Sequence, residues 1–224
     1  MTFSNRHDAG RQLGEALASL APNDPVVLGL WRGGVPIAAE VARALQAPLD
    51  ICIVRKLSAR GDIAIGAVAE GGAVYLDERE VDALGLSPTD IDFLVARELV
   101  EIGRDAELLR DHPPVALRGR DAVLVDDGVV TANTMRAAIR ALTSRGVRSI
   151  TVAVPVGALE SVLALRREVD RVVCLVSEPM LTSVGSRYRD FSSVSQAEVV
   201  ALLEGSRRDR TSLGWSSSAT TLSW

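Results

Sequence analysis

The sequence predicts an α/β protein in which a parallel sheet is flanked by helices. Two observations carry this prediction. Short apolar runs rich in Val, Ile and Leu alternate with longer segments whose apolar residues recur every three or four positions. In the C-terminal half, strand and helix patterns follow each other in succession, which is typical of a parallel sheet with helices on both faces.

The individual elements follow from these two periods. Strands are expected at residues 25–30, 49–54, 73–76, 122–125, 149–154 and 171–176, and helices at about 5–20, 35–46, 132–144, 159–168 and 195–203. The second helix carries Pro36 in its first turn, where the missing N–H group is tolerated. Residues 55–72 are rich in Gly and Ala, so we expect a mobile loop there.

A long helical pattern interrupts this alternation. Ser87-Pro88-Thr89-Asp90 is typical of a helix start, with Ser as the N-cap, Pro at the first helical position and an acid in the first turn. An apolar stripe then runs along one side of the segment as far as Leu109. We therefore expect a helical insertion over about residues 78–118.

Composition limits the classes of protein that the chain can belong to. The 224 residues are 47% hydrophobic and 24% charged, as expected for one globular domain over residues 1–204. Residues 205–224 are rich in Arg, Ser and Thr and are expected to be a disordered tail. The net charge of -4 gives no reason to expect a nucleic-acid partner. Without a membrane span or a signal layout, a cytoplasmic protein with no membrane partner is expected.

The cysteines and histidines suggest no chemistry of their own. Cys52 and Cys174 each lie inside an apolar run, which predicts buried, reduced thiols. His7 and His112 are far apart in the sequence, so neither a metal cluster nor a histidine-activated nucleophile is expected.

The segment with chemical content joins the strand at 122–125 to the helix that follows. It contains two adjacent acids, Asp126 and Asp127, and then a turn of mostly small residues. Ligands of parallel sheets bind at the carboxyl ends of the strands, where two carboxylates can accept hydrogen bonds from vicinal sugar hydroxyls. Backbone N–H groups, threonine hydroxyls and a helix N-terminus favour a phosphate dianion. The segment therefore suggests a ribose phosphate site.

This segment resembles the hallmark of the type I phosphoribosyltransferases, in which a strand, two acids and a T-G-G-T or T-A-G-T loop follow one another. Here the loop has Asn133 where Gly is commoner. The resemblance implies that Asp126 and Asp127 bind the ribose hydroxyls of 5-phosphoribosyl 1-diphosphate (PRPP), and that the loop binds its 5-phosphate. The loop residues are Gly128, Val129, Val130, Thr131, Ala132, Asn133 and Thr134.

Two further segments match the order of motifs in that family. Trp31-Arg32-Gly33-Gly34 follows the first strand, where the family grips the diphosphate, and we expect a cis peptide between Arg32 and Gly33. The basic residues Arg55, Lys56 and Arg60 follow the second strand, where the family has a catalytic loop. The resemblance implies that one or more of them reach the diphosphate, and a merely solvated strand end is the alternative.

The resemblance covers most of residues 5–204, and the chain is similar to a bacterial group of phosphoribosyltransferases with a helical insertion. It implies the type I fold with a small hood-like segment near the C-terminus. Residues 178–191, which include the pattern V-G-x-x-Y-x-D-F, would form that segment. Both acceptor recognition and a packed C-terminal turn stay open for it.

The implied activity is transfer of the phosphoribosyl group from PRPP to an unidentified nitrogenous acceptor, with release of diphosphate. The resemblance implies Mg²⁺ held mainly through PRPP, with Asp126 and Asp127 as further ligands. The catalytic set would be these two acids with Arg32 and Lys56. Family members that salvage 6-oxopurines usually carry an acid where this chain has Val130, so that acceptor class is disfavoured.

Three other classes of protein compete with this one. A non-catalytic protein of the same fold that senses PRPP or a nucleotide is the main alternative, although the chain shows no basic stripe for nucleic acid. A nicotinamide-cofactor enzyme is excluded because the first loop is not G-x-G-x-x-G, and a Walker-type ATPase because no Gly-Lys-Ser/Thr occurs. Association of identical chains is left open.

Overall fold

A five-stranded parallel sheet forms the centre of the protein, as the sequence predicted. The structure is a computed structural model that describes residues 2–20, 22–61 and 63–212. The strand order in the main sheet is β2-β1-β6-β7-β8, and every neighbouring pair is parallel. These strands are β1 (Pro25–Leu30), β2 (Leu49–Cys52), β6 (Asp121–Val125), β7 (Ser149–Ala158) and β8 (Arg171–Glu178).

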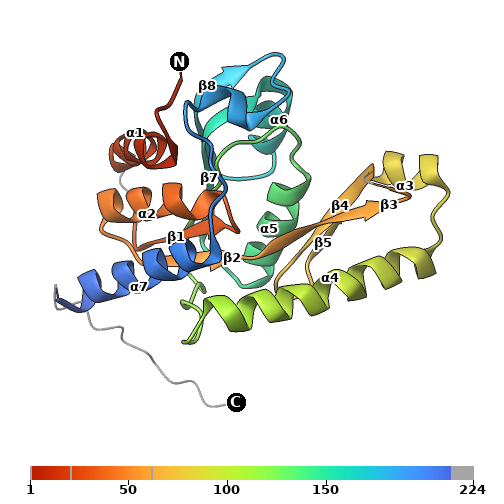
Figure 1. Cartoon of the computed structure of the whole chain (residues 1–224), viewed down its shortest axis with the longest axis horizontal. Helices are drawn as coiled ribbons and strands as arrows, with labels where there is room; N and C mark the ends of the chain where they lie inside the picture. The colour runs from red at the N-terminus through yellow and green to blue at the C-terminus, as the bar shows by residue number, and fades with distance from the viewer. Residues whose placement is uncertain (1, 21, 62, 213–224) are drawn as a thin grey trace.

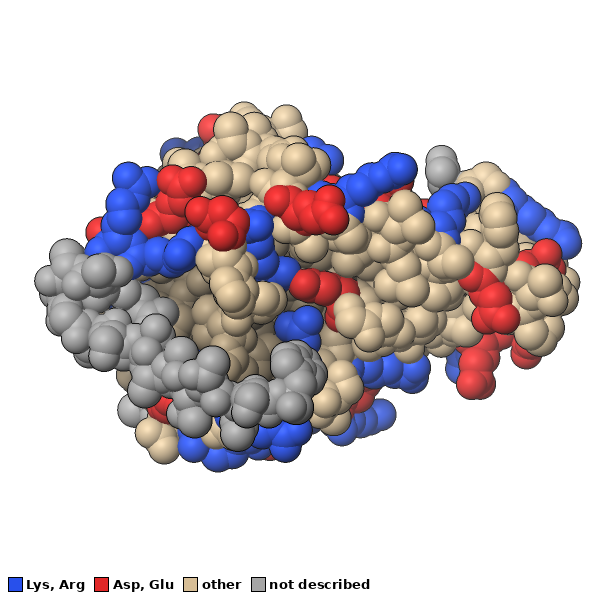
Figure 2. All heavy atoms as spheres, turned by 90° about the horizontal axis from the view of Figure 1, so that it is seen from below, with Lys and Arg blue, Asp and Glu red and all other residues tan. Residues whose placement is uncertain are grey.

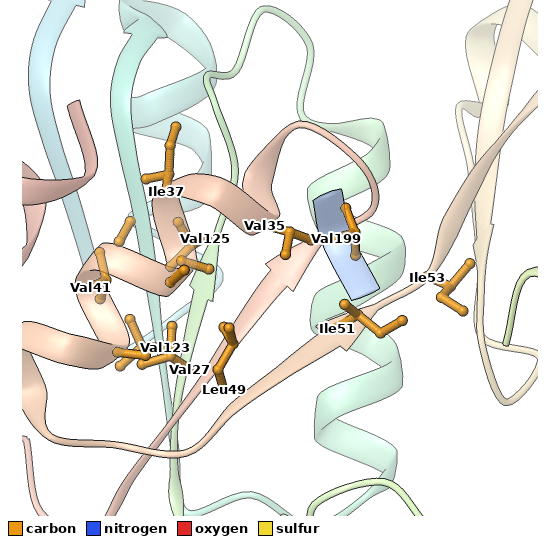
Figure 3. Packing of buried hydrophobic residues seen from close by; sticks show 14 of the residues in the cluster. Val27, Val35, Ile37, Val41, Leu49, Ile51, Ile53, Val123, Val125 and Val199 are labelled. Atoms are coloured by element: carbon orange, nitrogen blue, oxygen red, sulfur yellow. The ribbon is translucent and has the colours of Figure 1, made fainter. Parts of the chain in front are cut away.

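Helices cover both faces of this sheet (Figure 1). One face carries α1 (Arg6–Ala18), α2 (Gly34–Leu45) and α7 (Gln196–Ser212), and the other carries α5 (Asn133–Ser144) and α6 (Leu159–Leu165). Because successive strand residues point to opposite faces, Val27 packs with α2 whereas Val26 packs with α5. Figure 3 shows the first of these cores, in which Val123 and Val125 lie beside Val41.

A second, antiparallel sheet projects from the main body as an arm (Figure 1). It consists of β3 (Val54–Ala59), β4 (Ile63–Ala69) and β5 (Val74–Leu76), and it is followed by α3 (Glu78–Leu84) and α4 (Pro88–Leu109). The prediction of a loop over residues 55–72 was therefore wrong. Leu57 and Ile65 are fully buried in the same hydrophobic core as residues of α2 and β2, so packing holds this segment in place.

The glycines and alanines that suggested a loop have a packing role instead. Gly66 lies so close to β5 that a Cβ atom would overlap the carbonyl oxygen of Tyr75. Ala67 and Ala69 are completely buried against the main body. Small residues here allow the close approach of two backbones rather than flexibility.

The start of α4 agrees with the sequence prediction. Ser87 and Asp90 form a reciprocal capping box, and Pro88 occupies the first turn. The other end of the insertion is fixed by Arg110, whose side chain is only 5% exposed. Its guanidinium donates to Asp50 at 3.0 Å and to Glu70 at 2.5 Å, and also to the carbonyl oxygen of Ile51. The arm is thus tied to the edge of the main sheet by a buried ion-pair cluster.

The C-terminal helix is longer than predicted. α7 runs from Gln196 to Ser212, so residues 205–212 of the expected disordered tail are helical. Val199 and Leu203 of α7 are buried in the core beside α2, which explains why the helix forms here. The remainder of the expected tail, residues 213–224, lies outside the described residues.

Three further observations concern the surface charge, the helices and the cysteines of the described residues. On the face seen in Figure 2, the described acidic and basic side chains are interspersed and form no continuous basic stripe. No helix within the described ranges is both long enough and apolar enough to cross a membrane. Cys52 is buried as predicted, whereas Cys174 is only partly buried, and neither forms a disulfide in this structure.

Candidate active site

Two loops that follow neighbouring strands meet at one edge of the main sheet. β1 pairs with β6 along its length, so the loop after β1 and the acid pair after β6 leave the sheet side by side. A Cβ atom on Gly33 would overlap the Oδ2 oxygen of Asp127 and lie 2.8 Å from its Cγ. A Cβ atom on Gly34 would overlap the carbonyl oxygen of Val125. Both positions require glycine because the two loops touch.

The loop after β1 contains one non-proline cis peptide, which joins Trp31 to Arg32. The sequence prediction placed the cis peptide one residue later, between Arg32 and Gly33, and was wrong on that position. Arg32 is exposed, and its guanidinium carbon lies 5.2 Å from the centre of the Trp31 ring. The charge of Arg32 is therefore exposed to solvent, next in sequence to the glycine that touches Asp127.

The two acids after β6 lie where their ionised forms are unfavourable. Burial and the negative charge of Asp127 raise the pKa of the Asp126 carboxyl well above its usual range. Burial also raises the pKa of Asp127, although Arg6 opposes that shift. Asp126 accepts a hydrogen bond of 2.9 Å from the backbone N–H of Asp127. A pair of carboxylates kept together at this energetic cost is typical of a functional site.

Arg6, at the first position of α1, contacts the acid pair directly, and sequence reasoning missed it. Its Nε and Nη2 atoms donate to Oδ2 of Asp127 at 3.1 and 2.8 Å. Its Nη1 donates to the carbonyl oxygen of Ser192 at 2.7 Å, and its guanidinium stacks 3.8 Å above the Phe191 ring. The sequence held one weak signal, namely a cation in the first turn of a helix, where the helix dipole disfavours positive charge.

Hydrogen bonds to β7 and α6 hold the segment after the acids in place. Val129 donates from its N–H to the carbonyl oxygen of Val156 at 3.0 Å and accepts from Ala158 at 2.7 Å. The hydroxyl of Ser161 donates to the carbonyl oxygen of Val130 at 2.7 Å. The bonds to Val129 use β7 residues beyond the predicted strand end at 154, so the extra length of that strand supports the loop.

The remainder of this loop forms the N-terminus of α5. Thr131 is exposed, Ala132 is buried, and Asn133 and Thr134 are partly buried. The N-cap position belongs to Ala132, and no side chain caps the helix there. The first backbone N–H groups of α5 therefore have no side-chain acceptor at the cap, and an anion can take that place.

The basic residues after the second strand are divided between two places. Arg55 and Lys56 are neighbours in β3, so their side chains point to opposite faces of the small sheet. Arg55 donates to Glu98 at 2.8 Å and to Asp105 at 3.0 Å, which ties it to α4 and away from the acids. Lys56 is exposed, and its positive charge acts to lower the pKa of Asp126 against the larger effect of burial.

Arg60 lies at the turn between β3 and β4, with a left-handed backbone conformation at φ 47°. Its charge acts on Asp90 at the start of α4. Arg55 and Arg60 thus act on acids of α4, whereas the charge of Lys56 acts on Asp126. The prediction that one or more of these three basic residues reach the diphosphate stays a prediction, and Lys56 is the one whose charge acts on Asp126 in this structure.

The hood-like segment packs on the acid pair from above. The short helix η1 (Val184–Arg187) leads into Tyr188, whose hydroxyl donates to the carbonyl oxygen of Asp127 at 2.6 Å. A Cβ atom on Gly128 would lie 2.7 Å from Val184, so η1 also touches the first residue of the loop. Of the two roles that the sequence left open, the packed turn is present.

Comparison with known proteins agrees with this geometry. A family model described as "Phosphoribosyl transferase domain" matches residues 7–185, which include both loops, the arm and the acid pair. The chain belongs to this phosphoribosyl transferase domain family. The five-stranded parallel sheet flanked by helices is accordingly the type I phosphoribosyltransferase fold.

Individual relatives of this phosphoribosyltransferase chain are also similar over most of its length. The protein named "Putative phosphoribosyl transferase" of Mycobacterium tuberculosis is 41% identical over 210 residues, in each of two strains. That match covers 92% of this chain and 47% of the relative, so the chain spans about half the length of the curated relatives it matches. The crystal structure of TT1426 from Thermus thermophilus is 41% identical, with a TM-score of 0.78. The match covers 91% of this chain and 98% of TT1426.

The acid pair is the place at this edge of the sheet where side chains could help to hold a metal. No group of three or more His, Cys, Asp or Glu residues is gathered as a metal site within the described ranges. Asp126 and Asp127 offer the hard oxygen ligands that Mg²⁺ prefers, and two carboxylates suit an ion that keeps several other oxygen ligands. The residues thus fit an ion that arrives with a phosphorylated ligand.

Proposed function

We propose that this phosphoribosyltransferase uses PRPP, and transfers its phosphoribosyl group to a nitrogenous acceptor with release of diphosphate. The observation that carries the proposal is the contact between Gly33 and Asp127. Through that contact, a glycine loop suited to diphosphate lies directly against a carboxylate suited to a ribose hydroxyl. A ligand that carries both groups on one sugar is the natural occupant.

The sugar phosphate half of PRPP would occupy the β6 side of the site. Asp126 and Asp127 would accept hydrogen bonds from the ribose hydroxyls, and the uncapped N-terminus of α5 would receive the 5-phosphate. The fixed loop at Val129 and Val130 supports this assignment, because a rigid cradle loses little entropy when it binds an anion.

The diphosphate half would face Gly33, Gly34, Arg32 and Lys56. As the bond to C1 breaks, negative charge grows on the leaving diphosphate, and the two cations would stabilise it. Positive charge grows on the sugar near the carboxylates of the acid pair. Bound Mg²⁺, held by PRPP with Asp126 and Asp127, would supply further charge neutralisation. The residues of the site would hold and orient the sugar so that the acceptor attacks C1 from the face opposite the leaving diphosphate.

The acceptor is proposed only as a nitrogen nucleophile. Val130, at the position where 6-oxopurine-salvaging members carry an acid, has no side-chain group that could bind a purine ring nitrogen, and its carbonyl oxygen already accepts from Ser161. Hypoxanthine and guanine are therefore disfavoured as acceptors.

Diphosphate release from PRPP tests the proposal directly. The assay uses the whole chain with Mg²⁺ and a panel of nucleobases and amines, and Asp126→Asn serves as the inactive control. We expect release that depends on both one acceptor and Mg²⁺. Tight PRPP binding with no release for any acceptor would favour the sensing alternative, and absence of PRPP binding would overturn the proposal.

A further inference from the structure

Arg6 stands out because it lies outside every motif of the PRPP site and yet contacts the acid pair. Its side chain is 11% exposed and that of Asp127 is 16% exposed, so this ion pair is largely shielded from water. All three of its guanidinium nitrogens donate to oxygen atoms, and one face of the group rests on Phe191. A side chain held by four contacts has one orientation.

The two carboxylate oxygens of Asp127 have different partners. Both Arg6 hydrogen bonds to Asp127 go to Oδ2, and the backbone of Gly33 packs against the same oxygen. Oδ2 is thus enclosed between the N-terminal helix and the glycine loop. Oδ1 carries no Arg6 contact, so it is the oxygen that can accept from a ligand hydroxyl.

The support for Arg6 comes from both ends of the described chain. The backbone N–H of Phe3 donates to the carbonyl oxygen of Arg187 at 2.8 Å, and the carbonyl oxygen of Phe3 accepts from the N–H of Arg189 at 2.9 Å. The backbone N–H of Asp190 donates to the carbonyl oxygen of Ser4 at 3.0 Å. These bonds form a short parallel pairing between the segment before α1 and the hood. Arg6, Phe191 and Ser192 therefore keep their relative positions.

A purely structural role for Arg6 at the start of α1 explains little. The helix is already capped, because the Asn5 side chain accepts from the N–H of Asp8 at 2.9 Å. A cation in the first turn opposes the helix dipole. The position of Arg6 thus costs the helix stability while it serves the carboxylate.

We propose that Arg6 is a positioning residue for sugar recognition, which fixes the Asp127 carboxylate so that Oδ1 faces the ribose hydroxyls. The inference rests on the proposed function, since it assumes that the acid pair binds those hydroxyls. It adds that the N-terminal helix and the hood, through Arg6, set the preference of the site for ribose over deoxyribose.

The test compares ribose 5-phosphate with 2-deoxyribose 5-phosphate by calorimetry on the whole chain. The wild type should bind ribose 5-phosphate more tightly, and Arg6→Met should reduce that preference by about tenfold, the worth of one hydrogen bond to a charged group. Arg6→Lys should restore part of it. Arg11→Met, which removes an exposed arginine of the same helix, should leave the preference unchanged.

A merely structural role predicts another pattern, in which Arg6→Met weakens both sugar phosphates by the same factor and the preference persists. That result would overturn the inference while the proposed function stands. A wild type that shows no preference would overturn both. If Arg6→Met fails to fold, Phe191→Leu gives the answer, because it removes the ring beneath Arg6 and keeps its charge. An unchanged preference in Phe191→Leu and Arg6→Lys would then contradict the inference.

Discussion

Two clusters of buried charge in this protein look alike but differ in how completely their carboxylates are satisfied. At the edge of the main sheet, Asp50 accepts from Arg110 at 3.0 Å and from the N–H groups of Ile51 and Val115 at 2.8 Å. At the carboxyl end of β6, burial and mutual repulsion raise the pKa of Asp126, and burial raises that of Asp127.

The difference separates a structural cluster from a functional one. Asp50 is 2% exposed, and hydrogen bonds engage both of its oxygens, so nothing is left for a ligand. The acid pair keeps accepting capacity at the surface of a site, and the fold maintains it against its own electrostatic cost. Buried charge alone therefore does not mark a site; incomplete satisfaction does.

The structural cluster should respond most strongly to a single change. Arg110→Ala leaves the buried carboxylates of Asp50 and Glu70 without their cation, and we expect a loss of about 3–5 kcal/mol in the free energy of unfolding. Urea denaturation measures it, with the exposed Arg104→Ala on α4 as control. A loss no greater than that of the control would show that the cluster does not hold the arm.

Substitution of the acid pair should weaken ligand binding without unfolding the protein. Asp126→Asn combined with Asp127→Asn removes two charged acceptors, and we expect PRPP affinity to fall by about 3 kcal/mol or more while the protein stays folded. Calorimetry and circular dichroism check the two halves of this prediction. The matched control is Asp82→Asn with Asp92→Asn, two exposed acids of the arm. Unchanged PRPP affinity in the acid-pair variant would exclude the ribose assignment.

The neighbours Arg55 and Lys56 give the same contrast within one strand. Lys56→Ala should lower kcat roughly 100-fold with little change in PRPP affinity, because its contact would strengthen as the diphosphate leaves. Arg55→Ala should instead lower stability by about 1–2 kcal/mol, since Arg55 is partly exposed and binds Glu98 and Asp105. Steady-state kinetics and urea denaturation of both variants decide it. The assignment is wrong if Lys56→Ala raises only KM.

The smallest effect expected is a gain of stability. The folded-state pKa of Asp126 is raised above its ordinary value of 3.8, which means that the fold favours the protonated carboxyl. The stability that this group contributes is therefore fully present at pH values below 3.8. It is lost as the pH rises through the folded-state pKa. Asp126→Asn stays neutral, and should therefore increase the free energy of unfolding at a pH above the folded-state pKa of the wild-type carboxyl.

That gain should shrink as the pH falls through the raised folded-state pKa of Asp126, where the wild-type carboxyl takes up its proton. Thermal unfolding across this range measures the difference between Asp126→Asn and the wild type. The exposed Asp92→Asn should show no such trend. A variant less stable than the wild type at the alkaline end would mean that the Asp126 carboxylate stabilises the fold.

Sequence patterns alone were enough to predict the main sheet, the helices beside it and the place of the acid pair. Those features depend on local patterns: an apolar strand such as Asp121–Val125, a capped helix start at Ser87, and two acids at a strand end. The order of the motifs along the chain then predicted that the Gly33-Gly34 loop lies beside Asp127. The local patterns each lie within a few residues, so no distant contact is needed to recognise them, whereas the order of the motifs is read along the whole chain.

Which charged residues lie close to the acid pair could be seen only in the folded chain. Arg6 reaches Asp127 across 121 positions of sequence, and its partners Phe191 and Ser192 lie near the other end of the described chain. Arg55 was expected at the site, but the alternation of β3 turns it toward α4. The residues expected as a loop fold into strands because β5 and α4 bury them. A charge takes its role from the partner it meets in space, and sequence spacing does not carry that information.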